Sequence, residues 1–75
     1  MKYEDGFEVL LHDQVDLGGG VTGTVVAVLD TGMYTPDYLE EHWGYLAQGA
    51  LVKSLEIGLV HFPCPDVDFT LIRRG

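Results

Sequence analysis

The sequence predicts an all-β domain, and two observations carry that prediction. Residues 18–29 (GGGVTGTVVAVL) place three turn-forming glycines before a run of valine and threonine, residue types that suit a pleated surface. The rest of the 75-residue chain divides into short apolar segments separated by turn residues. The apolar content of 47% is enough for one small core, so we expect a single folded unit over residues 1–75.

The first strand is expected near the N-terminus. Residues 1–6 are predicted to be a polar lead-in. Residues 7–12 (FEVLLH) place Phe7, Val9 and Leu11 on one face, which is the alternation of a half-buried strand. Residues 13–17 continue the alternation into a hairpin whose tip is the glycine triplet.

The central strand is expected to follow the triplet, with apolar side chains on both of its faces. One face takes Val21, Val25, Ala27 and Leu29, and the other takes Val26 and Val28. Neighbouring elements must therefore cover this strand on two sides. Gly23 offers no side chain to pack and predicts a bulge within the strand.

Residues 33–49 are predicted to be a long loop that contains a short helix. Thr35 suits the helix cap and Pro36 suits the first turn, so the helix is expected over residues 36–42. Gly44 is expected to end it.

The C-terminal part predicts a hairpin and a closing strand. Residues 50–54 (ALVKS) and 59–62 (LVHF) form the hairpin, and two prolines at 63 and 65 end it. Residues 66–68 predict a tight turn. Residues 69–73 (FTLIR) supply a last strand that pairs back near the first.

Five strands in this order, with a helix-containing loop between the second and the third, resemble the SH3-like small barrel. The stretch VTGTVVAVL is similar to the one found in KOW-like barrels. A narrower resemblance is to SH3-like proteins of plasmids and integron cassettes, which include the type II dihydrofolate reductase. That family lines a tetramer pore with a strand ending in Tyr-Pro, where this chain has Phe62 and Pro63.

The same comparison places Val60 at the pore glutamine of that family and His61 at an isoleucine. The family's basic residue for the cofactor phosphate has no counterpart in this chain. The resemblance therefore implies the architecture of a five-stranded SH3-like barrel and neither the reductase activity nor its cofactor.

The charge excludes several partners. Twelve carboxylates against four Lys and Arg give a net charge of −8, which disfavours nucleic acids and anionic membranes. A basic protein partner and simple solubility both fit the charge.

The chain has no apolar run of about 18 residues and no signal-like start, so we expect a cytoplasmic protein. Cys64 is the only cysteine, so no intrachain disulfide is possible and stability must come from packing or assembly.

Six residues are the candidates for binding. Four aromatics gather in the long loop, and two residues come from the predicted edge strand: Tyr34, Tyr38, Trp43, Tyr45, His61 and Phe62. The rings fit three roles: a lid over an open end of the barrel, a partner or subunit interface, and a platform for a small ligand.

No catalytic or metal site is expected. We expect Cys64 to be a small buried thiol beside the strand histidine His61, because His61 would point from a strand while Cys64 lies in a rigid turn, which does not favour an activated Cys–His pair. The histidines and Cys64 lack the spacing of a zinc motif. The acidic residues near the helix predict a solvated face. The glycine triplet leads into a strand rather than a helix, which is unlike a phosphate-binding loop.

These observations predict a small acidic, non-enzymatic module that self-associates or binds a protein partner, without cofactors. The contact surface would combine the loop 33–49 with the edge at residues 59–62. Two alternatives stay open. One is an oligomeric small-molecule-binding or enzymatic barrel with its site at a subunit interface. The other is an accessory or immunity-type protein that masks a basic partner.

Overall fold

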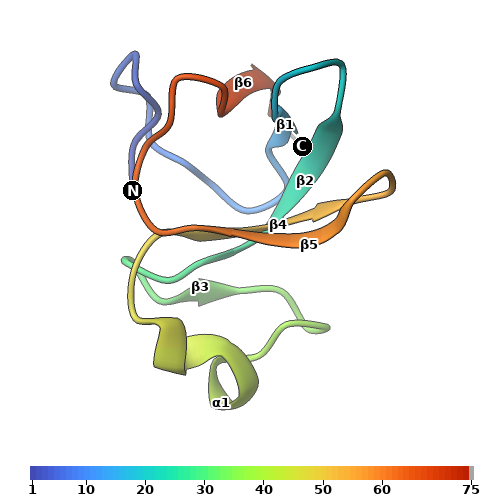
Figure 1. Ribbon diagram of the computed structural model, residues 1–75. Helices are drawn as coiled ribbons and strands as arrows, with labels where there is room; N and C mark the ends of the chain where they lie inside the picture. The colour runs from blue at the N-terminus through green and yellow to red at the C-terminus, as the bar shows by residue number, and fades with distance from the viewer. Residues whose placement is uncertain (75) are drawn as a thin grey trace.

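The computed structural model describes residues 1–74 and consists mainly of an antiparallel sheet, as predicted (Figure 1). Its strands are β1 (Gln14–Asp16), β2 (Thr22–Val28), β3 (Met33–Tyr34), β4 (Ala50–Ser54), β5 (Gly58–Phe62) and β6 (Thr70–Arg73). Between β3 and β4 lie the helix α1 (Glu40–Trp43) and a 3-10 turn, η1 (Gly44–Leu46). The strand β3 was not predicted, because it lies within the segment expected to be a loop.

The strand β2 is central, as expected from its valine-rich sequence. The sheet order is β5-β4-β2-β1-β6, and β3 also pairs with β2. The last strand, β6, pairs with β1, so the chain returns to its N-terminal part as predicted, although the strand it meets is residues 14–16 and not the predicted 7–12. Within residues 1–74 no ladder joins β5 to β6, so the sheet stays open between its two outer strands.

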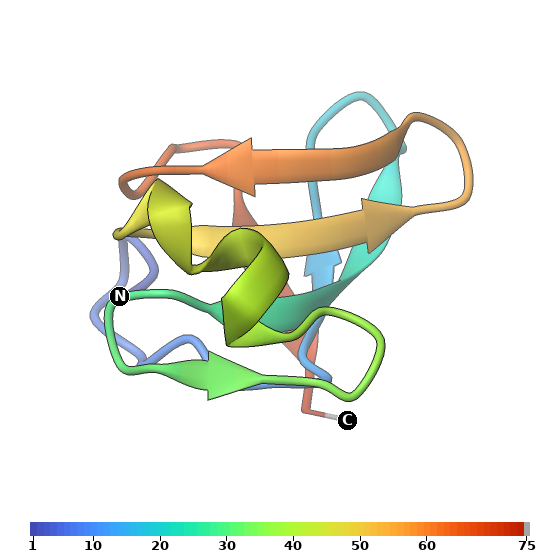
Figure 2. The ribbon, with the colours of Figure 1, turned by 90° about the horizontal axis from the view of Figure 1, so that it is seen from below.

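Both faces of β2 are covered by core residues. On one face the cluster that includes Val25 and Val28 packs with Val15, Val52 and Phe69. On the other face a smaller cluster lies between the sheet and the α1 segment (Figures 1 and 2). Its buried members are Val26, Ala27, Leu29 and Leu51. We call this second side the lid face.

The predicted assignment of side chains to the two faces of β2 was wrong in part. Val25 was placed with Ala27 and Leu29, but it packs with Val28 instead. The register against β4 shifts between Val25 and Ala27, which moves the later residues to the opposite face. The irregularity therefore lies two residues beyond Gly23. Gly23 serves close packing instead: a Cβ there would lie 2.6 Å from Cγ1 of Val52.

Residues 7–12 do not form a strand, contrary to the prediction. Phe7 is 60% exposed, while Val9 is fully buried. A turn at Gly6, which has a φ of 94°, folds the chain back so that Tyr3 N–H donates to the Phe7 carbonyl. The polar lead-in was also wrong, since the Tyr3 ring is buried and lies 5.1 Å from that of Phe69. The first strand begins only at Gln14.

The helix also differs from the prediction over residues 36–42. Thr35 does not cap it, because its hydroxyl donates to the Val26 carbonyl and so extends the β2–β3 pairing. The cap position is Leu39, which makes no side-chain bond. The helix α1 ends at Trp43 with Gly44 as its C-cap, as predicted, but Gly44 keeps a helical conformation and begins η1, which the chain leaves at Ala47, whose φ is 67°.

The two turns outside this segment are as predicted. All three glycines of the triplet have positive φ, and Leu17 N–H donates to the Val21 carbonyl across the tip. In the turn at 66–68, Phe69 N–H donates to the Asp66 carbonyl at 3.0 Å. The strand β4 has the predicted bounds, and β5 begins one residue earlier than predicted, at Gly58.

Candidate interaction surface

Three of the predicted aromatic residues form a cover on the lid face. Tyr34, Tyr38 and Trp43 are half-buried and pack against the cluster of Leu51 and its neighbours. The rings of Tyr38 and Trp43 lie 6.1 Å apart. They cover a face of β2 and β4, whereas the lid hypothesis placed them over an open end of a barrel. Their burial ties the α1 segment to the sheet.

The fourth ring, Tyr45, lies outside this packing. It is 76% exposed and belongs to neither core cluster. Among the loop aromatics it is therefore the one that presents most of its surface to solvent.

Replacing the packed Trp43 and the exposed Tyr45 by alanine is expected to change the free energy of unfolding by different amounts. Trp43→Ala removes a ring from the lid-face cluster and should lower the free energy of unfolding by about 2 kcal/mol. Tyr45→Ala should change it by no more than about 0.5 kcal/mol. Urea denaturation followed by far-UV circular dichroism measures both values. Equal losses of unfolding free energy in the two variants would contradict the conclusion that Trp43 is part of the core and Tyr45 is not.

The remaining two predicted residues, His61 and Phe62, point to opposite faces of β5. Phe62 pairs with Ala50, packs against the first core cluster and stacks on Phe69 at 4.6 Å between ring centroids. His61 pairs with Leu51 on the lid face, and its Nε2 lies 2.8 Å from the Gln48 carbonyl oxygen. The six predicted residues therefore do not converge on one point.

The hairpin between β4 and β5 and its edge at 59–62 were predicted, but the apolar side chains of its turn, Leu55 and Ile57, were not among the predicted binding residues. Leu55 is 96% exposed, Ile57 57% and Leu59 37%, so three large apolar side chains follow one another at alternate positions. The signal was available in the sequence, because a tight turn built from Leu, Glu and Ile departs from the usual Gly, Asn and Asp. We call these three residues the hairpin patch.

The backbone of this hairpin is well defined. Ser54 is buried, its hydroxyl donates to a Glu56 carboxylate oxygen at 3.0 Å, and its oxygen accepts the Glu56 N–H. Gly58 has a φ of 85° and lets the chain re-enter the ladder opposite Ser54. The hairpin patch is thus held out by an ordered turn, as the projecting β4–β5 tip in Figure 2 shows.

The strand β5 is also an open edge. Within residues 1–74 it pairs with β4 alone, so every second residue directs its N–H and C=O away from the sheet. Edge strands usually carry a charged residue or a proline that discourages pairing. The five residues of β5, GLVHF, contain neither.

The only cysteine does not pair with the strand histidine. Cys64 is exposed, which corrects the expectation of a buried thiol, because the two flanking prolines carry the chain away from the sheet.

Residues 1–74 contain no group of three His, Cys, Asp or Glu side chains able to hold a metal ion. In the same residues there is no pocket, and no helix is long and apolar enough to span a membrane.

A buried carboxylate ties the N-terminal segment to the end of β6. Asp13 is fully buried, and its Oδ2 accepts bonds from the Tyr3 hydroxyl (2.7 Å), the Leu10 N–H (3.0 Å) and Arg74 Nη1 (2.7 Å). Its other oxygen, Oδ1, is buried without a partner. Burial, and then the bond to Asp13, raise the pKa of Tyr3. Because no solvent reaches this carboxylate, it acts as a structural tie.

Asp30 gives the protein a testable dependence on pH. Burial disfavours its charge, but the Gly49 N–H at 2.8 Å and the Met1 amine at 3.1 Å outweigh that effect and lower its pKa. In the unfolded chain the Asp30 carboxyl has its ordinary pKa of about 4, and in the folded protein its pKa is lower. The ionised carboxylate therefore stabilises the fold above about pH 4, and this stabilisation is lost as the pH falls through the pKa of the folded protein. Asp30→Asn should therefore flatten the fall in unfolding free energy below about pH 4, as measured by urea denaturation. An unchanged slope would contradict this assignment.

Comparison with known proteins adds no relative: no protein-family model, curated protein or solved structure matches the chain.

Proposed function

We propose that this protein is a small non-enzymatic interaction module that contacts a protein partner, or a second copy of itself, through the β4–β5 hairpin. One observation carries the proposal: the hairpin patch stands exposed on an ordered turn beside the unpaired edge of β5. Exposed apolar side chains grouped in this way are typical of surfaces that another molecule covers.

The strand order supports the further proposal that the fold is related to the SH3-like barrels. The strands β1, β2, β4 and β5 follow one another in the sheet, and β6 returns to pair with β1. This is the arrangement that the resemblance implies, with the sheet left open between β5 and β6. An open sheet has an edge that a closed barrel does not have, and that edge is the part of the surface used in the proposal.

The proposal assigns different roles to the predicted binding residues. Tyr34, Tyr38 and Trp43 act from within the lid-face cluster, where they hold the α1 segment on the sheet. His61 lies on the exposed strand, and Tyr45 presents a free ring. These two residues are the ones available to extend a contact that begins at the hairpin patch.

The test is a triple variant, Leu55→Ser with Ile57→Ser and Leu59→Ser. It should abolish concentration-dependent association in sedimentation velocity, or the binding of any partner isolated with the wild-type protein. Far-UV circular dichroism should be unchanged, because all three side chains are largely outside the core.

The matched control is Val67→Ser, which removes another exposed apolar side chain, 73% exposed, from a different loop. It should associate as the wild type does. The proposal fails if the wild type is monomeric at all concentrations and binds no protein. It also fails if the triple variant and the control behave alike.

A further inference from the structure

We infer that the partner is a basic protein whose extended segment adds as a strand to β5, a step that rests on the proposed function. The segment would have apolar residues at alternate positions and Lys or Arg at its ends. The hydrogen-bonding edge of β5, the side chains that line it and the carboxylates that flank it in the sequence favour such a partner.

The edge of β5 can bind only an extended chain in this way. Its unpaired N–H and C=O groups are spaced along five residues, and a strand laid beside it would continue the ladder from β4 outward. Leu59 and His61 line the lid-face side of that position, and Val60 and Phe62 line the other. Because alternate side chains of a strand lie on one face, the apolar side chains of the incoming strand would meet either Leu59 or the pair Val60 and Phe62, depending on its register.

The opposite edge, β6, is less suited to this role. It ends at Arg73, and the adjoining Arg74 spans from β6 to the Glu8 carbonyl and to Asp13. Its cationic end would repel a basic segment. The two outer strands therefore differ in their fitness to bind a basic segment, and β6 serves as the control for β5.

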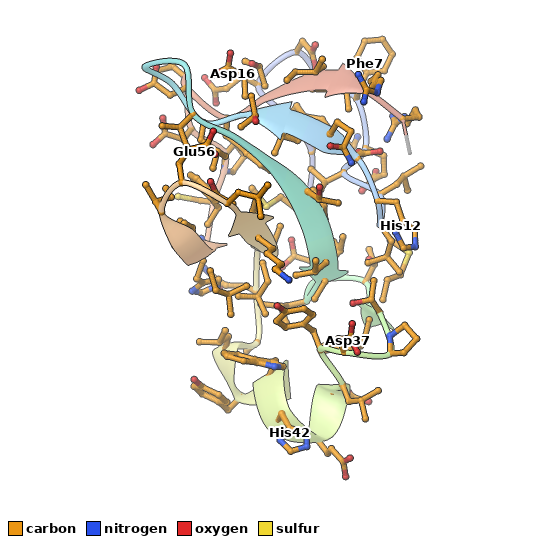
Figure 3. All side chains as sticks on the ribbon, turned by 90° about the vertical axis from the view of Figure 1, so that its right-hand side faces the viewer. Phe7, His12, Asp16, Asp37, His42 and Glu56 are labelled. Carbon is orange, nitrogen blue, oxygen red and sulfur yellow. The ribbon has the colours of Figure 1, made fainter. Side chains whose placement is uncertain are left out.

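Exposed carboxylates flank β5 in the sequence: Glu56 precedes the strand, and Asp66 and Asp68 follow it in the next turn. A Cβ on Gly18 would lie 3.1 Å from Cβ of Asp68, so the Asp68 side chain lies against the β1–β2 turn. Figure 3 shows Glu56 at the same end of the molecule as Asp16. Against these stands one cation, Lys53, opposite Leu59 on β4.

This charge pattern favours a basic partner over a second copy of the chain. Each copy carries a net charge of −8, so pairing two copies edge to edge brings two negatively charged surfaces together. A segment with basic ends instead places a cation near the exposed Glu56, at the hairpin end of β5. Electrostatic complementarity of this kind raises the rate and the selectivity of association.

The experiment uses a fluorescent synthetic peptide of sequence KKVTVTVKK and the full 75-residue protein at physiological salt. Fluorescence anisotropy should show saturable binding. A peptide with glutamates in place of the lysines should bind at least roughly tenfold more weakly. A peptide with proline at its central valine should lose binding, because proline cannot donate to a ladder.

Two protein variants locate the site. Leu59→Lys should weaken binding by at least roughly tenfold, because it places a cation and removes an apolar contact on β5. Ile72→Lys makes the same change on β6, where Ile72 is 50% exposed, and should stay within about twofold of the wild type. Amide hydrogen exchange of the complex should show new protection in β5 and none in β6.

Three results would overturn the inference: equal binding of the proline peptide, equal losses in the two variants, or protection of β5 in the protein alone at high concentration. The last would identify a second copy as the occupant of the edge. If the peptide does not bind while the triple hairpin variant still abolishes association, the inference is wrong and the proposed function stands.

Discussion

Replacing Gly49 by alanine is expected to unfold the protein at room temperature. Gly49 has a φ of 89°, a conformation that disfavours any side chain, and an added Cβ would overlap the carbonyl oxygen of Phe62 and lie 2.6 Å from Cα of Pro63. Both neighbours are backbone atoms, so the strain cannot be relieved by a side-chain rotation. We expect a loss of at least about 4 kcal/mol, close to the whole stability of a domain of this size.

The control for this variant is Gly20→Ala, in the glycine triplet. Gly20 also has a positive φ, 82°, but an added Cβ there would meet nothing within 4 Å. It should cost about 1 kcal/mol, the conformational term alone. Thermal denaturation followed by circular dichroism measures both variants. A cooperative transition of Gly49→Ala near that of Gly20→Ala would contradict the close packing of β5 against residue 49.

Replacing Asp13 by alanine is expected to cost about 3 kcal/mol. The change leaves the buried Tyr3 hydroxyl without its acceptor and removes the tie between the N-terminal segment and Arg74. Arg74 is partly exposed and returns to water, so the loss falls mainly on the buried groups. Urea denaturation of the variant measures the change.

A second substitution, at Tyr3, tests whether the hydrogen bond between Tyr3 and Asp13 accounts for part of this loss. Tyr3→Phe alone should cost about 1 kcal/mol, because it removes one hydrogen bond from the buried carboxylate. In the Asp13→Ala background the same change should cost nothing, since the hydroxyl no longer has a partner. Additive losses would show that the two residues act independently and that the short contact between them contributes little.

Where local chemistry decides the conformation, the sequence alone was sufficient. The strand β4 begins and ends where ALVKS begins and ends, and the glycine triplet turns where three residues tolerate positive φ. The central position of β2 also follows from its composition, because a strand with apolar side chains on both faces needs partners on both. These features depend on residues that are neighbours in the chain.

The errors arose where a distant contact outweighed the local pattern. The alternation of FEVLLH predicts a strand, but the turn at Gly6 and the core places taken by Tyr3 and Val9 fold that segment across the sheet instead. Thr35 has the chemistry of a helix cap, yet it bonds to the carbonyl of Val26, nine residues earlier. Nothing near either residue in the sequence indicates the group that it contacts.

The candidate interaction surface was also predictable only in part from the sequence. The aromatic residues of the loop 33–49 were visible in the sequence, but only packing against Leu51 shows that three of them are committed to the core and that Tyr45 is not. The hairpin patch consists of ordinary apolar residues. The edge that contains Leu59 was predicted, whereas the exposure of Leu55 and Ile57 beside an unpaired strand is seen only in the structure.

The sequence by itself determined that this protein is a small, acidic, mainly β chain organised around one valine-rich strand. Composition and the alternation of side chains are enough for that, because they set which surfaces must leave water. Only the tertiary structure decided which rings are buried and which apolar residues remain outside. Those outcomes depend on pairing and packing between segments far apart in the chain, and no local pattern records which partner each segment finds.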